Sequence, residues 1–320
     1  MIRFLSILMA AALAAGIAHA QTWPDRPVRV IVPFPAGSSA DVAARILGNE
    51  LNTRLGQQLV IDNRPGASGN IGSDVVAKAA PDGYTLGFAT TSTHAVAVGL
   101  SPTLPYDPVK SFAPVALISI SPYVLVVYPK LPANNLADLI ALAKAKPGTV
   151  SYGSAGLASL AHLASALFEN LAGVKLNHIP YKSSAQSVVD LISGRLDMQF
   201  ATIPPTISNI NAGQVRALAT TGTRRVSALP DVPTMAEAGM ANYDASLWLA
   251  MVAPAGTPPD IVNRLNREIV EVLNMPRIKE ALAVQGMETE PGPPEALANL
   301  IGSEIEKWRK VITQAGIKEN

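Results

Sequence analysis

Hydrophobic positions along the chain alternate between short β-rich runs and longer stretches with helical spacing. A run over 28–32 is rich in valine and isoleucine and ends before Pro33 and Pro35, which predicts a buried strand. Apolar residues then recur every three or four positions over 39–55, which predicts a helix that ends at Gly56. Strands over 59–61 and 84–89 and a helix over 71–80 continue this order.

The same alternation returns further along the chain. We expect strands near 123–128, 150–152, 176–181, 198–200, 217–219 and 247–252, and helices near 136–146, 157–171, 184–193, 261–273, 277–285 and 294–315. Strands separated by helices pair in parallel through right-handed crossovers. The pattern predicts an α/β fold with mainly parallel sheets and two lobes. Residues 21–121 and 245–320 form lobe 1, residues 122–244 form lobe 2, and a ligand binds between them.

The first twenty residues predict the compartment. Arg3 is their only formal charge, an apolar run follows over 5–15, and Ala18-His19-Ala20 provides a small-x-small cleavage signal. We expect a signal peptide cleaved after Ala20 and a periplasmic protein. A retained membrane anchor is the alternative, although the run is shorter than the roughly 20 residues that span a bilayer. A lipid anchor is excluded because the chain contains no cysteine.

Net charge limits the possible binding partners, and chain length allows a stable core without disulfides. Without Arg3 the 25 Lys and Arg become 24, against 24 Asp and Glu. A neutral chain argues against nucleic acid or an anionic membrane as the partner. No disulfide is available, but a chain of about 300 residues buries roughly three quarters of its unfolded surface. We expect a soluble monomer.

The loop after the first strand holds the first candidate binding group. Its residues are Phe34, Ala36, Gly37, Ser38 and Ser39, with Asp41 just beyond. Gly37 permits a tight turn, and Ser38-x-x-Asp41 fits a helix capping box. Free N–H groups and the helix dipole predict an anion site without any Lys or Arg. An ordinary capped helix is the alternative, and we expect Asp41 to stabilise the loop rather than act as a base.

Similar segments follow other predicted strands. They contain Ser154, Ala155, Gly156, Ser159 and His162; Tyr181 and Lys182 after the strand 176–181; Ala201 after the strand 198–200; and Thr90 and Ser92 after the strand 84–89. Glycine lets a ligand approach the backbone, and serine offers a hydroxyl group. Two such turns from different lobes predict a clamp for a dicarboxylate. Lys182 either pairs with a carboxylate or remains solvated.

Residues for catalysis or metal binding are missing from the sequence. GxSxG, HExxH, GxGxxG and GxxxxGK[ST] do not occur, and there is no cysteine nucleophile. No metal cluster with sensible spacing occurs, and His162 is either a ligand donor or a structural histidine. We therefore expect a binding protein without cofactor or metal. A hydrolase would need a nucleophile paired with a base.

Ordered motifs cover the chain from about Trp23 to Ile317. They are PFPAG (33–37), NRPG (63–66), GNIG (69–72), AAPDGYTL (79–86), LPYDP (104–108), PYK (180–182), LPDVPT (229–234) and APAGTP (253–258). This combination resembles the tripartite tricarboxylate receptor family, also called Bug proteins, which are periplasmic solute-binding proteins. The resemblance implies a type II periplasmic-binding fold whose lobes close on a small organic carboxylate, either a di- or tricarboxylate or an aromatic acid.

The resemblance also implies how the ligand is held and passed on. Residues 34–39 would hold one carboxylate and residues 154–159 the other end, and a membrane permease would receive the ligand. A component that presents its ligand to a sensor kinase is the alternative, and the sequence does not separate the two.

Three residues depart from the family pattern. Ser38 and Ser183 stand where glycine is usual, and Gln186 stands where proline is common. These changes leave the ligand open. Phe34 and Tyr181 would flank an aromatic ring or enclose an aliphatic chain.

Overall fold

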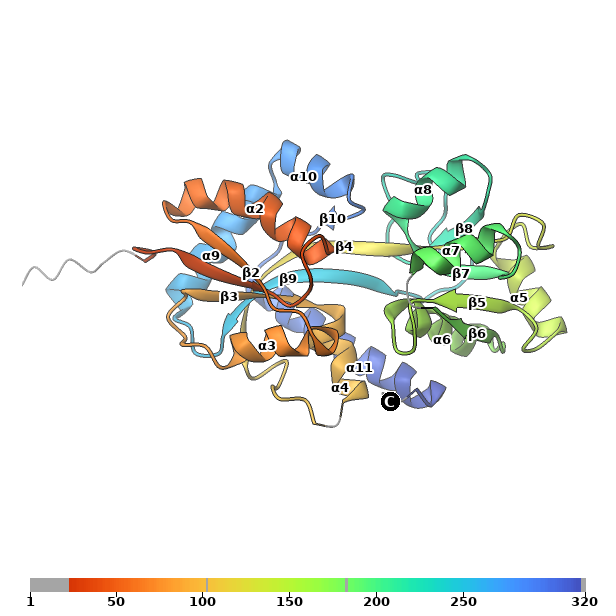
Figure 1. Ribbon diagram of the computed structural model, residues 1–320, viewed down its shortest axis with the longest axis horizontal. Coiled ribbons are helices and arrows are strands. Elements are labelled where there is room, and N and C mark those ends of the chain that lie inside the picture. The colour runs from red at the N-terminus through yellow and green to blue at the C-terminus, as the bar shows by residue number, and fades with distance from the viewer. Residues whose placement is uncertain (1–22, 102, 182–183, 318–320) are drawn as a thin grey trace, which may run out of the picture.

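Two α/β lobes are joined by long strands that run between them (Figure 1). The computed structural model describes residues 23–101, 103–181 and 184–317. The linking strands are β4 (Phe112–Val127) and β9 (Ser246–Pro254), which pair antiparallel. The expected signal peptide lies outside the described residues.

Lobe 1 is built on a sheet with the strand order β2-β1-β3-β9-β4. Its other strands are β1 (Val28–Val32), β2 (Leu59–Asn63), β3 (Thr85–Thr90) and β10 (Glu288–Thr289). Its helices are α2 (Ser39–Leu55), η1 (Ala67–Gly69), α3 (Asn70–Ala77), η2 (Ser92–Val96), α4 (Ala97–Leu100), α9 (Pro259–Leu273), α10 (Pro276–Ala283) and α11 (Pro294–Ala315). Four of the five residues of β1 are buried, as expected for a parallel strand covered on both faces.

Lobe 2 is built on a sheet with the order β4-β7-β5-β6, and β8 pairs with β4. The strands are β5 (Ser151–Ser154), β6 (Asn177–Pro180), β7 (Met198–Thr202) and β8 (Arg216–Thr220). The helices are α5 (Leu136–Ala145), α6 (Leu160–Ala172), α7 (Ser184–Ile192) and α8 (Ile203–Asn211). In both lobes the parallel pairs lie away from β4, whereas every pairing that involves β4 or β9 is antiparallel.

Strand β4 belongs to both sheets. Residues 112–122 pair with β9, and residues 123–127 pair with β7 and β8. At the transition the buried hydroxyl of Thr221 accepts the Tyr123 N–H at 2.8 Å and donates to the Ala245 carbonyl at 2.9 Å. One side chain thus ties together the two segments that connect the lobes.

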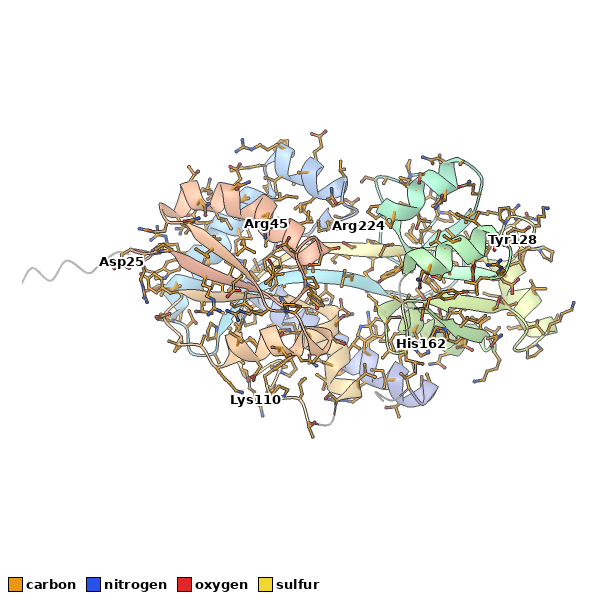
Figure 2. All side chains as sticks on the ribbon, viewed as in Figure 1. Asp25, Arg45, Lys110, Tyr128, His162 and Arg224 are labelled. Atoms are coloured by element: carbon orange, nitrogen blue, oxygen red, sulfur yellow. The ribbon has the colours of Figure 1, made fainter. Side chains whose placement is uncertain are left out.

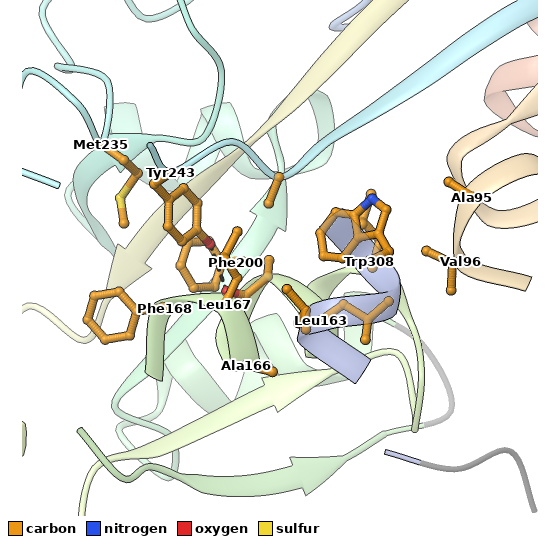
Figure 3. Close-up of a cluster of buried hydrophobic side chains, with 14 of the residues drawn as sticks. Ala95, Val96, Leu163, Ala166, Leu167, Phe168, Phe200, Met235, Tyr243 and Trp308 are labelled. Carbon is orange, nitrogen blue, oxygen red and sulfur yellow. Dashed lines mark hydrogen bonds between the residues drawn. The ribbon is translucent and has the colours of Figure 1, made fainter. Parts of the chain in front are cut away.

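A buried apolar cluster continues from one lobe into the other through α11 (Figure 3). Trp308 of α11 lies between Val96 of lobe 1 and Leu163 of α6 in lobe 2. Trp308 is fully buried, and its indole N–H donates to the buried Glu304 carboxylate at 2.9 Å. Because protein interiors are close-packed, this contact couples the position of α6 to that of α11.

The α/β fold predicted from the hydrophobic pattern is confirmed, and the sheets are mixed where the linking strands enter. The strand expected over 123–128 is the second part of a 16-residue strand. Its first part escaped prediction because Pro114 interrupts the pattern, and a register shift next to it accommodates the proline. Helices η2 and α4 were also missed, since the β-branched threonines at 90, 91 and 93 favour a strand unless tertiary packing decides otherwise. Within the described ranges, no helix has the length and hydropathy needed to cross a membrane.

Candidate functional site

The loop between β1 and α2 is held by Asp41. Its carboxylate accepts the Gly37 N–H at 2.9 Å, while the Ser38 hydroxyl accepts the Asp41 N–H at 3.3 Å. Gly37 has a φ of +82°, which only glycine adopts without strain. The loop therefore curls over the start of α2, where the first N–H groups have no partner within the helix.

Asp41 is 3% exposed and is bonded from two further sides. Arg45 Nε donates to its oxygens at 3.0 and 3.1 Å, and Asn63 Nδ2 donates to it at 3.0 Å. Asn63 Nδ2 also lies 3.0 Å from the Phe34 carbonyl, to which it donates. The hydrogen bond from Arg45, followed by those from Gly37 and Asn63, holds the pKa of Asp41 below its ordinary value. The carboxylate is ionised, and its hydrogen bonds hold the loop in place.

A second set of hydrogen bonds shapes the turn between β5 and α6. The hydroxyls of Ser154 and Ser159 both donate to the Gly156 carbonyl, at 2.9 and 2.8 Å. Ser159 also caps α6 by accepting the His162 N–H at 3.3 Å. His162 Nδ1 in turn accepts the Ala158 N–H at 3.0 Å. The turn is closed by neutral side chains alone.

Two histidines stack against this turn. The rings of His162 and His178 lie 4.1 Å apart at 11°, and His178 Nε2 is 2.7 Å from the Ser154 hydroxyl oxygen. Burial lowers the pKa of His162, and burial together with the neighbouring His162 lowers the pKa of His178 to about 4. Both rings are therefore neutral at neutral pH. Because His162 Nδ1 is an acceptor, its proton resides on Nε2.

A cavity of about 270 Å³ lies between the lobes, near the lower end of the range for small-molecule sites. Its lining comes from the β2–α3 loop, from η2 and α4, and from the β5–α6 turn. The residues are Ser68, Asn70, Ser92, Val96, Ala97, Leu100, Ala155, Leu157, Ala158 and Ser159. Ser68 (φ +55°) and Ala158 (φ +59°) are left-handed on opposite walls. Such strain costs roughly 1–3 kcal/mol per residue and concentrates at binding sites.

Ser68 and Asn70 are cavity residues that sequence reasoning missed. They lie beside Gly69, where a Cβ would meet Thr93 Cγ2 at 2.6 Å and Phe34 Cζ at 3.1 Å. Two glycines, at 66 and 69, directly after a predicted strand were a usable signal.

The predicted site residues do not all reach this cavity. Ser92, Ala155 and Ser159 line it, whereas Ser39 lines a second interlobe cavity of about 280 Å³ together with Tyr123 and Thr202. Of the other first-loop residues, Ala36 and Gly37 are exposed, and Phe34 and Ser38 are half-buried; none of the four lines either cavity. Among the labelled side chains, Arg45 marks α2 on lobe 1 and His162 marks α6 on lobe 2 (Figure 2).

Three more predicted residues have structural partners or are enclosed. Thr90 is buried and its N–H donates to the Thr93 hydroxyl at 3.1 Å, and Ala201 is fully buried. The Tyr181 hydroxyl donates to Asp190 at 2.8 Å, and burial together with this carboxylate raises the pKa of Tyr181 to about 12. Lys182 lies outside the described residues.

Comparison with known proteins identifies the family. The sequence profile of the tripartite tricarboxylate transporter family receptor matches residues 43–317. The chain belongs to this family. Protein BugT of Bordetella pertussis is 42% identical to this receptor over 323 residues, which cover 99% of each chain. The family resemblance drawn from the sequence motifs is confirmed.

Solved structures agree in fold. A Rhodopseudomonas palustris protein solved with adipate has 38% identity and a TM-score of 0.78, covering 93% of this receptor and all of that chain. The periplasmic binding protein BugD has 33% identity and a TM-score of 0.74, with coverage of 93% and 100%. MatC of R. palustris, solved with malate, has 31% identity and a TM-score of 0.73, with coverage of 91% and 100%.

These comparisons define the class of protein. Members of the family are periplasmic solute-binding receptors rather than enzymes, which confirms that part of the sequence prediction. Over residues 23–101, 103–181 and 184–317, His, Asp and Glu side chains do not gather in any group of three that could hold a metal ion.

Proposed function

We propose that this receptor captures a small organic carboxylate between its lobes for the membrane permease of a tripartite tricarboxylate transporter. Lobe 1 comprises residues 21–121 and 245–320, and lobe 2 comprises residues 122–244. The ligand lies where the carboxyl ends of β1, β3, β5 and β7 face the opposite lobe. This places it between the β1–α2 loop and the β5–α6 turn.

The observation that carries the proposal is the matched construction of these two segments. Asp41 shapes one and Ser154 with Ser159 shapes the other, and each segment leads into a helix N-terminus. Helix N-termini bind carboxylates through unpaired N–H groups and a positive dipole end. Backbone donors held in place before binding lose little entropy when the anion arrives.

Two relatives support a carboxylate ligand. The R. palustris protein with adipate and MatC with malate have TM-scores of 0.78 and 0.73 to this receptor. Both ligands are dicarboxylates, which suits two anion-binding segments on opposite lobes. Removal of residues 1–20 after Ala20 would release the receptor into the periplasm, where the permease meets it.

Calorimetry and thermal melting with a panel of carboxylates test the proposal. We expect one or a few acids to raise the melting temperature by mass action. Gly37→Leu should abolish this shift, because it fills the approach to the α2 N-terminus. Gly148→Leu is the matched control, since Gly148 also has positive φ (+74°) and open surroundings but lies in another loop. The absence of any response across the panel would refute the proposal.

A further inference from the structure

An apolar wall forms part of the cavity between the lobes. Leu157, in the β5–α6 turn, is 55% exposed, and Val96, Ala97 and Leu100 line the same cavity from η2 and α4. Val96 belongs to the buried cluster that contains Trp308, so this side of the wall is fixed in place. Covering a large aliphatic side chain that is exposed at the tip of a turn with an apolar group of a ligand is favourable, because it removes apolar surface from water.

The polar groups of the same cavity are small and uncharged. They are the hydroxyls of Ser68, Ser92 and Ser159 and the amide of Asn70, and the lining contains no Lys, Arg, Asp or Glu. The lining also offers no aromatic ring on which a flat ligand would stack. A ligand rich in hydroxyl groups would leave some of them unpaired against Leu157 and Val96, which is unfavourable. A ligand with polar ends and an aliphatic middle matches this distribution.

We propose that the cavity selects carboxylates whose body is an unbranched methylene chain, and that Leu157 sets this preference. The inference rests on the carboxylate-binding function proposed above and narrows its ligand class. One carboxylate is held by the N–H and hydroxyl groups of the β5–α6 turn, while the chain runs between Leu157 and Leu100. Each methylene that becomes buried should strengthen binding about fourfold.

Leu157 has one competing role, which is to seal the lobes when they close. A side chain that only seals the lobes strengthens the binding of every acid by the same factor. A side chain that contacts the ligand chain strengthens binding in proportion to the number of methylenes it covers. The two roles therefore differ in how affinity depends on chain length.

Calorimetric titration of the mature receptor with straight-chain dicarboxylates, from succinate to suberate, separates these roles. We expect affinity to rise about fourfold per methylene over at least two steps and then to fall when the chain exceeds the cavity. Leu157→Asn should flatten this rise while leaving succinate affinity within about threefold of wild type. Leu171→Asn is the matched control, because Leu171 is a 45% exposed leucine of lobe 2 outside the cavity. It should leave the whole series unchanged, and melting curves of both variants check that they are folded.

Three results would overturn the inference. They are a flat series in the wild type, strongest binding of short hydroxylated acids such as malate or of aromatic acids, and an equal loss across the series in Leu157→Asn. Each of these leaves the proposed receptor function standing. Failure of every acid in the series and in the wider panel would instead refute the proposed function itself.

Discussion

His162 and His178 lie ring on ring at 4.1 Å, and His178 meets the Ser154 hydroxyl of the β5–α6 turn at 2.7 Å. Protonation of either ring would place a charge against the other. Protonation of His162 would also remove the acceptor of the Ala158 N–H. The turn that faces the interlobe cavity is therefore built for two neutral histidines.

Stability should fall as the pH drops from about 6.5 to about 4. The folded pKa of His178 is about 4, below the ordinary value of 6.5, so in this window the unfolded chain binds protons that the folded chain does not. His94, whose pKa burial lowers to about 3, acts in the same direction. Melting temperatures across this range check the prediction. His178→Gln should show a shallower slope, and identical slopes would contradict it.

Asp41→Asn should weaken both the fold and ligand binding. The amide lacks the charge that holds Arg45. Its NH2 group also replaces an oxygen that accepts a hydrogen bond, so one N–H donor around Asp41 loses its acceptor, and we expect a stability loss of about 1–3 kcal/mol. In the variant the β1–α2 loop is no longer held in place before the ligand arrives. Ordering this loop on binding should lower affinity about tenfold, or about 1.4 kcal/mol. Urea denaturation and calorimetry measure the two effects. Asp62→Asn is the control, since Asp62 pairs with Arg29 and Arg64 away from the loop, and an equal affinity loss there would contradict the prediction.

Thr221→Val should destabilise the junction between the lobes. Valine keeps the shape but leaves the Tyr123 N–H and the Ala245 carbonyl without their partner, at about 1–3 kcal/mol for each buried group. Thr221→Ser retains the hydroxyl and should recover most of this loss. Chemical denaturation of the three proteins gives the comparison. Equal stability of the Val and Ser variants would show that the bridge is energetically unimportant.

Trp308→Ala should lower the free energy of unfolding by about 3–5 kcal/mol, because it opens a cavity in a fully buried cluster shared by both lobes. It also removes the N–H that Glu304 accepts at 2.9 Å. Trp308→Phe retains much of the ring and should cost less, so the difference between the variants isolates the volume effect. A loss below about 1 kcal/mol in the Ala variant, measured by urea denaturation, would contradict the role of Trp308 in joining the lobes.

Much of the local structure could be predicted from the chain itself. The valine-rich run of β1, the helical spacing over 39–55 and the Ser38-x-x-Asp41 cap all appear in the structure, with Asp41 bonded to the Gly37 N–H as well. Such features depend on neighbours a few residues apart, which periodicity and capping rules describe directly. The same holds for the start of α6 at its Ser159 cap.

Only the tertiary structure decided which residues, distant in sequence, come together between the two lobes. Ser68, Asn70 and Leu157 share one cavity although they come from segments far apart in sequence, and Thr221 bridges Tyr123 across 98 residues. It also decided that β4 serves both sheets and that Trp308 joins the cores of the two lobes. Local patterns report which face of an element is apolar, but the partner that buries that face is chosen by packing of the whole chain. The sequence by itself therefore determined most of the elements, the class of receptor and the character of its turns, whereas long-range packing decided which side chains line the cavity between the lobes.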